Sequence, residues 1–494
     1  MTKSAKIIAY YLPLSVLILG AALRINVYFQ NRSLIIDEAN LARYVIENKW
    51  TNFYQYQDKK LNYHQYAPPI FSSLSKINLR LLGNNEYALK LPSIIAGILS
   101  LVALGYLLHY FLGPTVVVSY ILLLFSFSEL SVRYSSEFKQ YATDTLLAVG
   151  FVVAAVRLRK KFLTLPKTVL WAVAGAFSIW ASMSIIFILA AIGLGFLWQY
   201  KQGKLKFAYI SAIGTTWILS FAYYFFSILL KDAGEAHLIS YHAPFFFDVW
   251  PTDFTAFNKD YQLLLSLFRC STDQTLLGIS WAFLMFCLGL HQLFKKDRYL
   301  FIVLFAPILF CFIASGLHFY TLIERLILFL SPFVLLIMAF GLHFLWQQKN
   351  RLLQLALVAV MLVTVVNKGG YRYFWTKMEF EDSKTVLAYI HDQKRDATIF
   401  VQHDAVPAFV FYNELHDNAW QFEHYYLAKW EEYPTGNFIR NLEKANNPSF
   451  WLFLSHTFPA ASIDQFVQNA RTIGPIKKEY KSVQASAYLV HIDG

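Results

Sequence analysis

The chain has 494 residues, of which 57% are hydrophobic and only 15% are charged. Soluble globular domains carry about 25% charged residues, so this composition excludes an ordinary soluble protein and favours one that lies in a lipid bilayer. The formal net charge is +12, but membrane topology explains the basic residues better than nucleic acid does, so we expect no nucleic-acid partner.

Runs of roughly 20 mostly apolar residues predict membrane-spanning helices. About eleven such runs follow one another along the chain, two of them short for a span. The first run follows a basic end, as in a signal peptide, but no credible cleavage site precedes Arg24, so we expect a retained helix. The predicted spans are 7–24, 91–111, 115–129, 141–157, 166–181, 183–200, 207–230, 273–294, 299–317, 324–346 and 352–367.

Basic residues cluster on one side of this predicted bundle. Short loops rich in Lys and Arg remain in the cytoplasm, which predicts a multi-pass protein of the cell (inner) membrane with a cytoplasmic N-terminus. The clusters are Lys3, Lys6, Arg157, Arg159, Lys160, Lys161, Lys201, Lys204, Lys206, Lys295, Lys296, Arg298, Lys349 and Arg351. The outer side then receives 25–90, 130–140, 231–272 and 368–494, which hold nearly all the acidic residues and histidines. We therefore expect any chemistry on the outer face.

The chain divides into two expected parts. Residues 1–367 form a polytopic α-helical module with outer loops 25–90 and 231–272, and residues 368–494 form a small α/β domain that is periplasmic or extracellular. In the latter, the sequence predicts a helix at 379–393 and strands at 397–402, at 449–454 and twice within 477–492. We expect this domain to dock the acceptor, with aromatic rings able to stack on sugars at Trp420, Tyr425, Tyr426 and Trp430.

The first outer loop carries two adjacent carboxylates, Asp37 and Glu38, about a dozen residues beyond the first span. A carboxylate close to the membrane surface can act as general base on an acceptor hydroxyl. The structural alternative is that Asp37 caps a helix that begins at Glu38, whose charge favours the first turn.

The same loop continues with His64, Gln65 and Tyr66 ahead of the pair Pro68-Pro69. Two prolines fix the backbone and interrupt any preceding helix, so these polar side chains are candidates for positioning a substrate. Alternatively, the prolines only start a helix over 70–82.

Polar residues also enter the fourth span. If residues 131–147 form one helix, then Arg133, Glu137, Gln140, Tyr141 and Asp144 share a face, whereas Lys139 lies off it. Polar side chains in a membrane helix are costly and therefore functional by default. The structural alternative is a local Arg133–Glu137 ion pair and a contact between Asp144 and a neighbouring helix.

Tyr320 and Arg325 lie near the outer end of the tenth span. A guanidinium there can hold a phosphate with two hydrogen bonds, or it can pair with Glu324 or extend to the interface. The loop 231–272 has no metal-ligand spacing, and the three cysteines predict neither a metal site nor a disulfide framework. No metal ligand is therefore predicted, although a divalent cation stays open as a cofactor.

These features, in this order, resemble the GT-C glycosyltransferases. They are most similar to the bacterial relatives of protein O-mannosyltransferases (glycosyltransferase family 39) and of the aminoarabinose transferase that modifies lipid A. The resemblance covers most of residues 7–415 and departs from the aminoarabinose transferase pattern at Asn40, Tyr66 and Ala67. Its motifs are Asp37-Glu38, Pro68-Pro69, the run 83–93 like G-x-N-E-x-A-x-R-L-P-S, the polar stretch 134–141, Tyr320 with 325–329, and 403–409.

The resemblance implies transfer of a sugar from a polyprenyl-phosphate carrier to a protein, lipid or glycan acceptor, within membrane lipid. Asp37, with Glu38 beside it, is the expected general base, and a single base without an enzyme nucleophile implies inversion. Expected contacts to the donor phosphate and lipid are Arg133, Lys139, Gln140, Tyr141 and Arg325. Expected substrate-positioning residues are His64, Gln65, Tyr66, Glu137 and Tyr320. The alternatives are a flippase or transporter of lipid-linked sugars and a non-catalytic scaffold.

Overall fold

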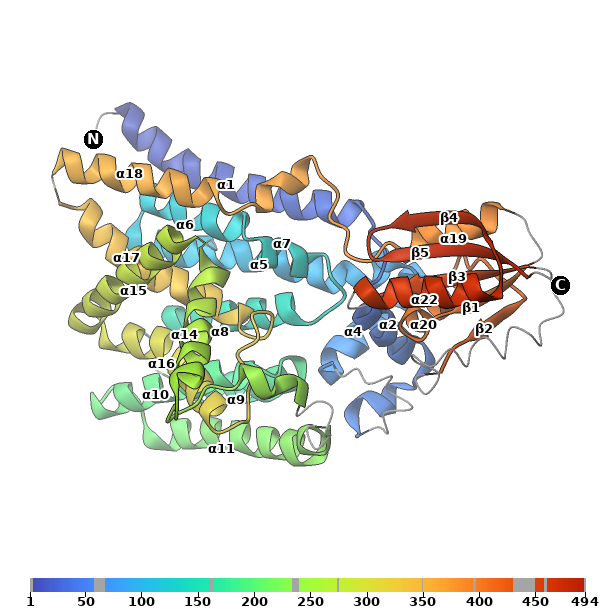
Figure 1. The fold of residues 1–494 in the computed structure, drawn as a ribbon. Coiled ribbons are helices and arrows are strands. Elements are labelled where there is room, and N and C mark those ends of the chain that lie inside the picture. The colour runs from blue at the N-terminus through green and yellow to red at the C-terminus, as the bar shows by residue number, and fades with distance from the viewer. Residues whose placement is uncertain are drawn as a thin grey trace.

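The computed structural model describes residues 3–56, 67–159, 163–232, 240–272, 275–348, 350–393, 397–429, 449–456 and 460–492. A bundle of helices forms one end of the molecule, and a sheet flanked by helices forms the other (Figure 1). The N-terminus lies at the end of the bundle that is far from the sheet (Figure 1). His64, Gln65 and Tyr66 fall outside the described residues, so their predicted roles stay predictions.

The predicted membrane architecture is confirmed. Within the described residues, seven helices are long and apolar enough to cross a membrane, and four shorter apolar helices accompany them. In lipid, a helix satisfies its own backbone hydrogen bonds, which is why each apolar run becomes one. The helices are α1 (Lys3–Phe29), α5 (Glu86–Leu112), α6 (Val116–Ser126), α8 (Tyr141–Leu158), α9 (Leu165–Ala181), α10 (Ile185–Lys201), α11 (Phe207–Tyr224) with η2 (Phe225–Leu229), α15 (Leu276–Lys296), α16 (Arg298–Gly316), α17 (Ser331–Trp346) and α18 (Arg351–Val366).

Shorter elements fill the expected outer loops. They are α2 (Ile36–Glu47), η1 (Trp50–Tyr54), α4 (Pro69–Leu82), α7 (Glu129–Ser135), α12 (Leu230–Asp232), η3 (Ala243–Phe245), α14 (Phe254–Ser271) and η5 (Gly370–Phe374), whereas η4 (Leu328–Leu330) lies within the predicted span 324–346. Pro69 is the first residue of α4, a position where its missing N–H costs nothing. The interpretation of the proline pair as a helix start is therefore confirmed.

The single helix expected over 131–147 is wrong. Helix α7 ends at Ser135 and α8 begins at Tyr141. Between them the backbone turns twice, with the N–H of Ser136 bonded to the carbonyl of Arg133 and that of Lys139 to the carbonyl of Glu137. The serine hydroxyls compete for backbone groups in this stretch, since Ser136 donates to the Arg133 carbonyl as well. Glu137 and Gln140 therefore lie on a tight turn, with Arg133 near the end of α7 and Tyr141 and Asp144 in the first turn of α8, rather than all five along one helical face.

Helix α17 is the most enclosed span, with 78% of its apolar window buried. It packs closely on α15 because each helix places a glycine at the contact. A methyl group added at Gly289 would meet the carbonyl oxygen of Ile337, and one added at Gly341 would meet that of Met285. Small residues that let backbones approach are typical of helix contacts in membranes.

Gly289→Ala is therefore expected to destabilise the bundle by about 1 to 3 kcal/mol, the usual effect of overpacking. Thermal denaturation of the purified protein in detergent measures this loss. Gly193→Ala in α10 is the matched control, because no atom lies within 4 Å of a methyl group added there. Equal melting temperatures for the two variants would contradict the close α15–α17 packing.

The C-terminal unit, residues 383–491, contains a five-stranded sheet of order β2-β1-β3-β5-β4. Strands β2, β1 and β3 run parallel, and β5 and β4 are antiparallel additions. Its elements are α19 (Ser383–Asp392), β1 (Thr398–Val401), η6 (His403–Ala405), α20 (Val406–Val410), η7 (Phe411–Leu415), β2 (Tyr425–Leu427), β3 (Ser449–Ser455), α22 (Ala460–Ile473), β4 (Ile476–Ser482) and β5 (Ala485–His491). The helix and the four strands that the sequence predicts are present. Strand β2 and helix α22 were not predicted.

One face of this sheet shares a hydrophobic core with segment 25–90, the predicted first outer loop. The core joins Leu41 of α2, Phe71 of α4, Phe409 of α20 and Phe453 of β3. Figure 1 shows α2 and α4 beside the sheet. The first outer loop and the C-terminal unit are therefore packed as one body, which fixes where α2 points.

The predicted aromatic docking surface is not a single platform. The Tyr425 ring contacts Phe409 at 5.1 Å, whereas the Tyr426 ring stacks on Phe400 at 5.5 Å. Neighbouring residues of a strand face opposite sides of a sheet, so these two rings cannot bind one sugar together. Trp430 lies outside the described residues.

Candidate active site

Helix α2 supplies two carboxylates to the site. Its first turn leaves one of them partly exposed and buries the other. Asp37 is partly exposed, and its Oδ2 lies 3.9 Å from Nη1 of Arg325. Glu38, the next residue, is fully buried. Asp37 and Arg325 are almost 300 positions apart in the sequence and were predicted as separate site residues. The structure brings them together.

Both carboxylate oxygens of Glu38 have partners inside the protein. Oε2 accepts hydrogen bonds from Nη1 of Arg32 at 2.6 Å and from the N–H of Ile35 at 3.1 Å, and Oε1 accepts from the N–H of Phe138 at 2.5 Å. Burial would raise the pKa of Glu38, but the charges of Arg32 and Lys90 more than offset it, so the pKa is lowered. Glu38 is therefore an anionic anchor for the first turn of α2. This geometry does not support the catalytic role expected for it.

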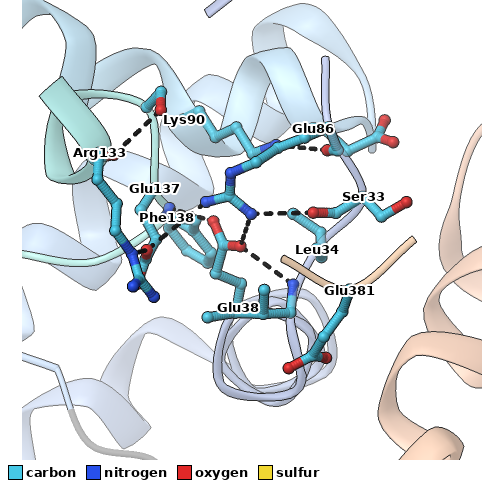
Figure 2. Close-up of polar contacts among 12 residues, drawn as sticks. Ser33, Leu34, Glu38, Glu86, Lys90, Arg133, Glu137, Phe138 and Glu381 are labelled. Carbon is cyan, nitrogen blue, oxygen red and sulfur yellow. Dashed lines mark hydrogen bonds and ion pairs between the residues drawn. The ribbon is translucent and has the colours of Figure 1, made fainter. Parts of the chain in front are cut away.

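Glu137 is likewise held by ion pairs inside the protein. Its Oε2 lies 2.7 Å from Nε of Arg133 and 3.7 Å from Nη2 of Arg32. Figure 2 shows Glu38 between the segment of Ser33 and Leu34 and that of Glu137 and Phe138. The local Arg133–Glu137 pair suggested as an alternative is therefore present, and Glu137 orients Arg133 rather than standing ready for a substrate.

The guanidinium of Arg133 is held over an aromatic ring as well. Its Cζ lies 4.0 Å from the ring centroid of Phe380, a favourable cation–π contact. Burial would lower the pKa of Arg133, but the neighbouring Glu137 raises it overall, so the group stays positively charged. A fixed, charged guanidinium of this kind is suited to holding a phosphate.

Lys139 is buried close to the Asp37–Arg325 pair, contrary to the expectation that it lies off the polar face. Burial lowers its pKa, and of its charged neighbours Asp37 raises it while Arg325 lowers it. Gln140 is also buried, and its Oε1 has no hydrogen-bond partner among the described residues. The ring of Tyr141 meets that of Tyr134 at 4.8 Å. The turn between α7 and α8, not a helical face, brings these groups to the site.

Tyr320 has a packing role that differs from the expected contact with substrate. Its hydroxyl donates to the carbonyl of Leu326 at 2.8 Å, and its ring meets Phe187 at 5.0 Å. Tyr320 thus braces the segment that carries Arg325. Nη2 of Arg325 donates to the hydroxyl of Tyr241 at 3.2 Å. The carboxylate paired with Arg325 is that of Asp37 rather than that of Glu324, the partner suggested as an alternative.

A cavity of about 500 Å³ opens beside Arg325, within the size range of small-molecule sites, about 300–1,000 Å³. Basic and apolar side chains share its wall, and Glu324 is the one acidic residue among its lining residues in the described part of the chain. Its lining comprises Leu130, Arg133, Tyr134, Pro244, Phe245, Lys259, Gln262, Leu263, Ser266, Arg269, Leu322, Ile323, Glu324 and Arg325. A wall of this kind suits a phosphate that carries an apolar chain.

Sequence reasoning missed the contribution of α14 to this cavity. Lys259, Gln262, Ser266 and Arg269 recur at helical spacing, and all four line the cavity. That pattern is visible in the sequence, but only the fold shows which cavity the helix faces. Asp253 caps α14 by accepting from the N–H of Ala256 at 2.8 Å.

The described residues contain no group of three or more His, Cys, Asp or Glu side chains that could hold a metal ion. In loop 231–272, Asp248 pairs with Lys259 at 2.5 Å. His237 lies outside the described part of the chain.

Comparison with solved structures decides the fold. The chain matches ArnT from Cupriavidus metallidurans bound to undecaprenyl phosphate, with a TM-score of 0.55 over 99% of this chain and 98% of that one, at 10% sequence identity. The apo state of the same ArnT matches with a TM-score of 0.51 over 96% and 97% of the two chains, also at 10% identity.

The chain has the ArnT fold. The resemblance to the aminoarabinose transferase relatives is thus confirmed for the fold, over nearly the whole length of both chains. No protein-family model matches the sequence, and no curated protein matches it. Low identity limits the likeness to ArnT to architecture, so the chemistry of this chain has to be argued from its own residues.

Proposed function

We propose that this protein is a membrane glycosyltransferase that moves a sugar from a polyprenyl-phosphate carrier to an acceptor hydroxyl at the outer face of the membrane. One observation carries the proposal. Asp37, a partly exposed carboxylate, lies 3.9 Å from Arg325, which lines a cavity that is both cationic and apolar. A carboxylate and a guanidinium thus lie side by side, and transfer from a lipid phosphate requires a base next to a phosphate-binding cation.

In the proposed reaction, Asp37 takes the proton of the acceptor hydroxyl as the oxygen forms a bond to the anomeric carbon. The bond from that carbon to the phosphate oxygen breaks, and its electron pair goes to the phosphate. Arg133, Lys259, Arg269 and Arg325 hold the phosphate as its negative charge develops. Attack opposite the leaving group, without an enzyme nucleophile, inverts the anomeric centre.

The carrier assignment rests on the chemistry of the cavity wall and on one relative. A polyprenyl phosphate combines a small anion with a long apolar chain, and the cavity combines basic with apolar side chains. The solved ArnT is bound to undecaprenyl phosphate, which supports the same class of carrier here. The proposed outer location rests on the basic clusters of the sequence.

A flippase for lipid-linked sugars would bind the same carrier without cleaving it. Purified protein in lipid nanodiscs, offered a panel of radiolabelled polyprenyl-phosphate sugars, separates the two functions. We expect cleavage of at least one donor, with release of free polyprenyl phosphate. Saturable binding of the carriers without cleavage of any donor would contradict the transferase and favour the flippase.

Arg325→Ala is expected to weaken binding of undecaprenyl phosphate about tenfold or more, the usual effect of losing a hydrogen bond to a charged group. Binding to the protein in nanodiscs, followed by native mass spectrometry, measures the effect. Arg351→Ala is the matched control, because Arg351 is an exposed arginine at the start of α18, outside the candidate site. Equal affinities of the two variants would contradict the assignment of Arg325 to the phosphate.

A further inference from the structure

The C-terminal unit presents the ends of two parallel strands toward α2. Strands β1 and β3 are parallel neighbours, so Val401 pairs with Phe453 and both strands end at the same edge. Gln402 and Asp404 follow β1, and His456 follows β3. In open α/β sheets, ligands bind beyond the carboxyl ends of parallel strands. None of these residues has a part in the donor site described above.

His456 is tied to the helix that carries Asp37. Its Nδ1 lies 2.5 Å from Oε1 of Glu381, and Oε2 of Glu381 accepts the N–H of Ile36 at 2.9 Å. His456 also has a left-handed backbone, with φ of +53°. Such a conformation is unfavourable in a residue other than glycine and concentrates at functional sites. Glu381 therefore links a strained histidine to the residue next to Asp37.

Other polar groups converge on the same place. Burial would lower the pKa of His456, but the hydrogen bond and charge of Glu381 raise it overall, and Asp404 and Asp37 contribute in the same direction. Gln402 is 1% exposed, and its Oε1 has no hydrogen-bond partner among the described residues. A buried acceptor without a partner is unusual in a folded protein and suits a ligand hydroxyl.

We propose that the carboxyl edge of β1 and β3 forms the acceptor side of the active site, with His456, oriented by Glu381, positioning the acceptor against Asp37. This inference rests on the proposed glycosyl transfer and adds the side from which the acceptor enters. His456 is a positioning residue, because the proton goes to Asp37 and the new bond forms at the acceptor oxygen.

Charge is divided between the two sides in a way that selects the acceptor. The donor cavity gathers Arg133, Lys259, Arg269 and Arg325, whereas His456 contacts the carboxylate of Glu381, and the negative charges of Glu381, Asp404 and Asp37 raise its pKa. An anionic phosphate nucleophile would be repelled by these three carboxylates, each unfavourable contact weakening its binding. The acceptor group that enters here is therefore an uncharged hydroxyl, which a carboxylate, an imidazole and an amide oxygen can all bind.

The test compares two fates of one donor. The donor is the radiolabelled polyprenyl-phosphate sugar that the wild-type protein cleaves, and the acceptor is an envelope extract of source cells that lack this gene. Transfer to extract components and hydrolysis by water are measured together. We expect His456→Asn to lower the ratio of transfer to hydrolysis about tenfold or more. Glu381→Gln should lower the ratio in the same direction, because it leaves His456 without its charged partner.

His391→Asn is the matched control, since His391 belongs to the same unit but is exposed on α19. An unchanged ratio of transfer to hydrolysis in His456→Asn would overturn the inference. A parallel fall of both activities leaves this ratio unchanged and counts as the same result. Wild-type protein that hydrolyses the donor but labels nothing in the extract would overturn it too. Wild-type protein that does not cleave any donor would instead contradict the proposed function itself.

The bond formed in the product tests the acceptor class. A sugar linked to a phosphate is released by mild acid, whereas a sugar linked to an alcohol oxygen is stable to it. We expect the labelled product to resist mild acid. Rapid release of the label would mark a phosphate acceptor and overturn the assignment of an uncharged hydroxyl.

Discussion

Asp37→Asn is expected to lower sugar transfer by about 10²- to 10⁴-fold, the contribution typical of a general base. The amide keeps the shape of the side chain and a contact to Arg325 but cannot take the proton of the acceptor hydroxyl. Initial rates at saturating donor measure the loss. The affinity for undecaprenyl phosphate is expected to change much less, because the phosphate contacts lie on the cationic side of the cavity.

Asp392→Asn provides the matched control for this variant. Its carboxylate is 80% exposed at the end of α19, so its replacement should leave the rate of transfer unchanged. Wild-type rates in Asp37→Asn would show that another group is the base. Glu38 is a poor substitute because it is sealed inside the protein, so Asp404 would be tested next.

Glu38→Gln is expected to have the largest effect on stability, about 3 to 5 kcal/mol, because it leaves buried cations without their counter-charge. Arg32 and Lys90 are both buried and both act on this carboxylate. Thermal denaturation in detergent and protection of the outer part from protease measure the effect. Glu47→Gln, at the exposed end of the same helix, should change the stability by less than about 1 kcal/mol.

The same carboxylate predicts a dependence of stability on pH. The pKa of Glu38 in the folded protein lies below its ordinary value of 4.5. A lowered folded pKa contributes stability above the unfolded pKa, and this contribution is lost as the pH falls through the folded value. The difference between wild type and Glu38→Gln should therefore persist at neutral pH and shrink as the pH falls below 4.5 toward the lowered pKa of Glu38. A difference that shrinks already between pH 6 and 8, a range chosen around neutrality, would contradict the buried anion.

The architecture could be predicted because it depends on local patterns. Each span needs a run of apolar residues long enough for the bilayer. A strand such as 449–454 is recognised as a short apolar run next to turn-forming residues. The break at 136–140 escaped prediction because the polar residues on both sides of it keep the spacing of a continuous helix. Only the side-chain competition of the serines and the contacts of Glu137 with Arg32 and Arg133 decide that the helix stops there.

The candidate site was predicted in pieces. Asp37, Arg133 and Arg325 stood out by residue type and by their place at the outer ends of spans, but their proximity depends on the packing of the whole chain. The sequence favoured Asp37 as the base but kept Glu38 beside it as a second catalytic residue, and only burial separates the partly exposed carboxylate from the anchor. His456 could not be singled out from the sequence. The strand before it was predicted at 449–454, but the approach of its end to α2 depends on the fold and has no local signal.

The most direct test of the central claim is a cryo-EM structure of the protein in lipid nanodiscs with undecaprenyl phosphate added. We predict density for the phosphate within hydrogen-bond distance of Arg325 and of at least one of Arg133, Lys259 and Arg269, with the prenyl chain leading along α14 and Asp37 beside the phosphate. An empty cavity at saturating lipid, or a phosphate bound at the opposite end of the bundle, would contradict the account.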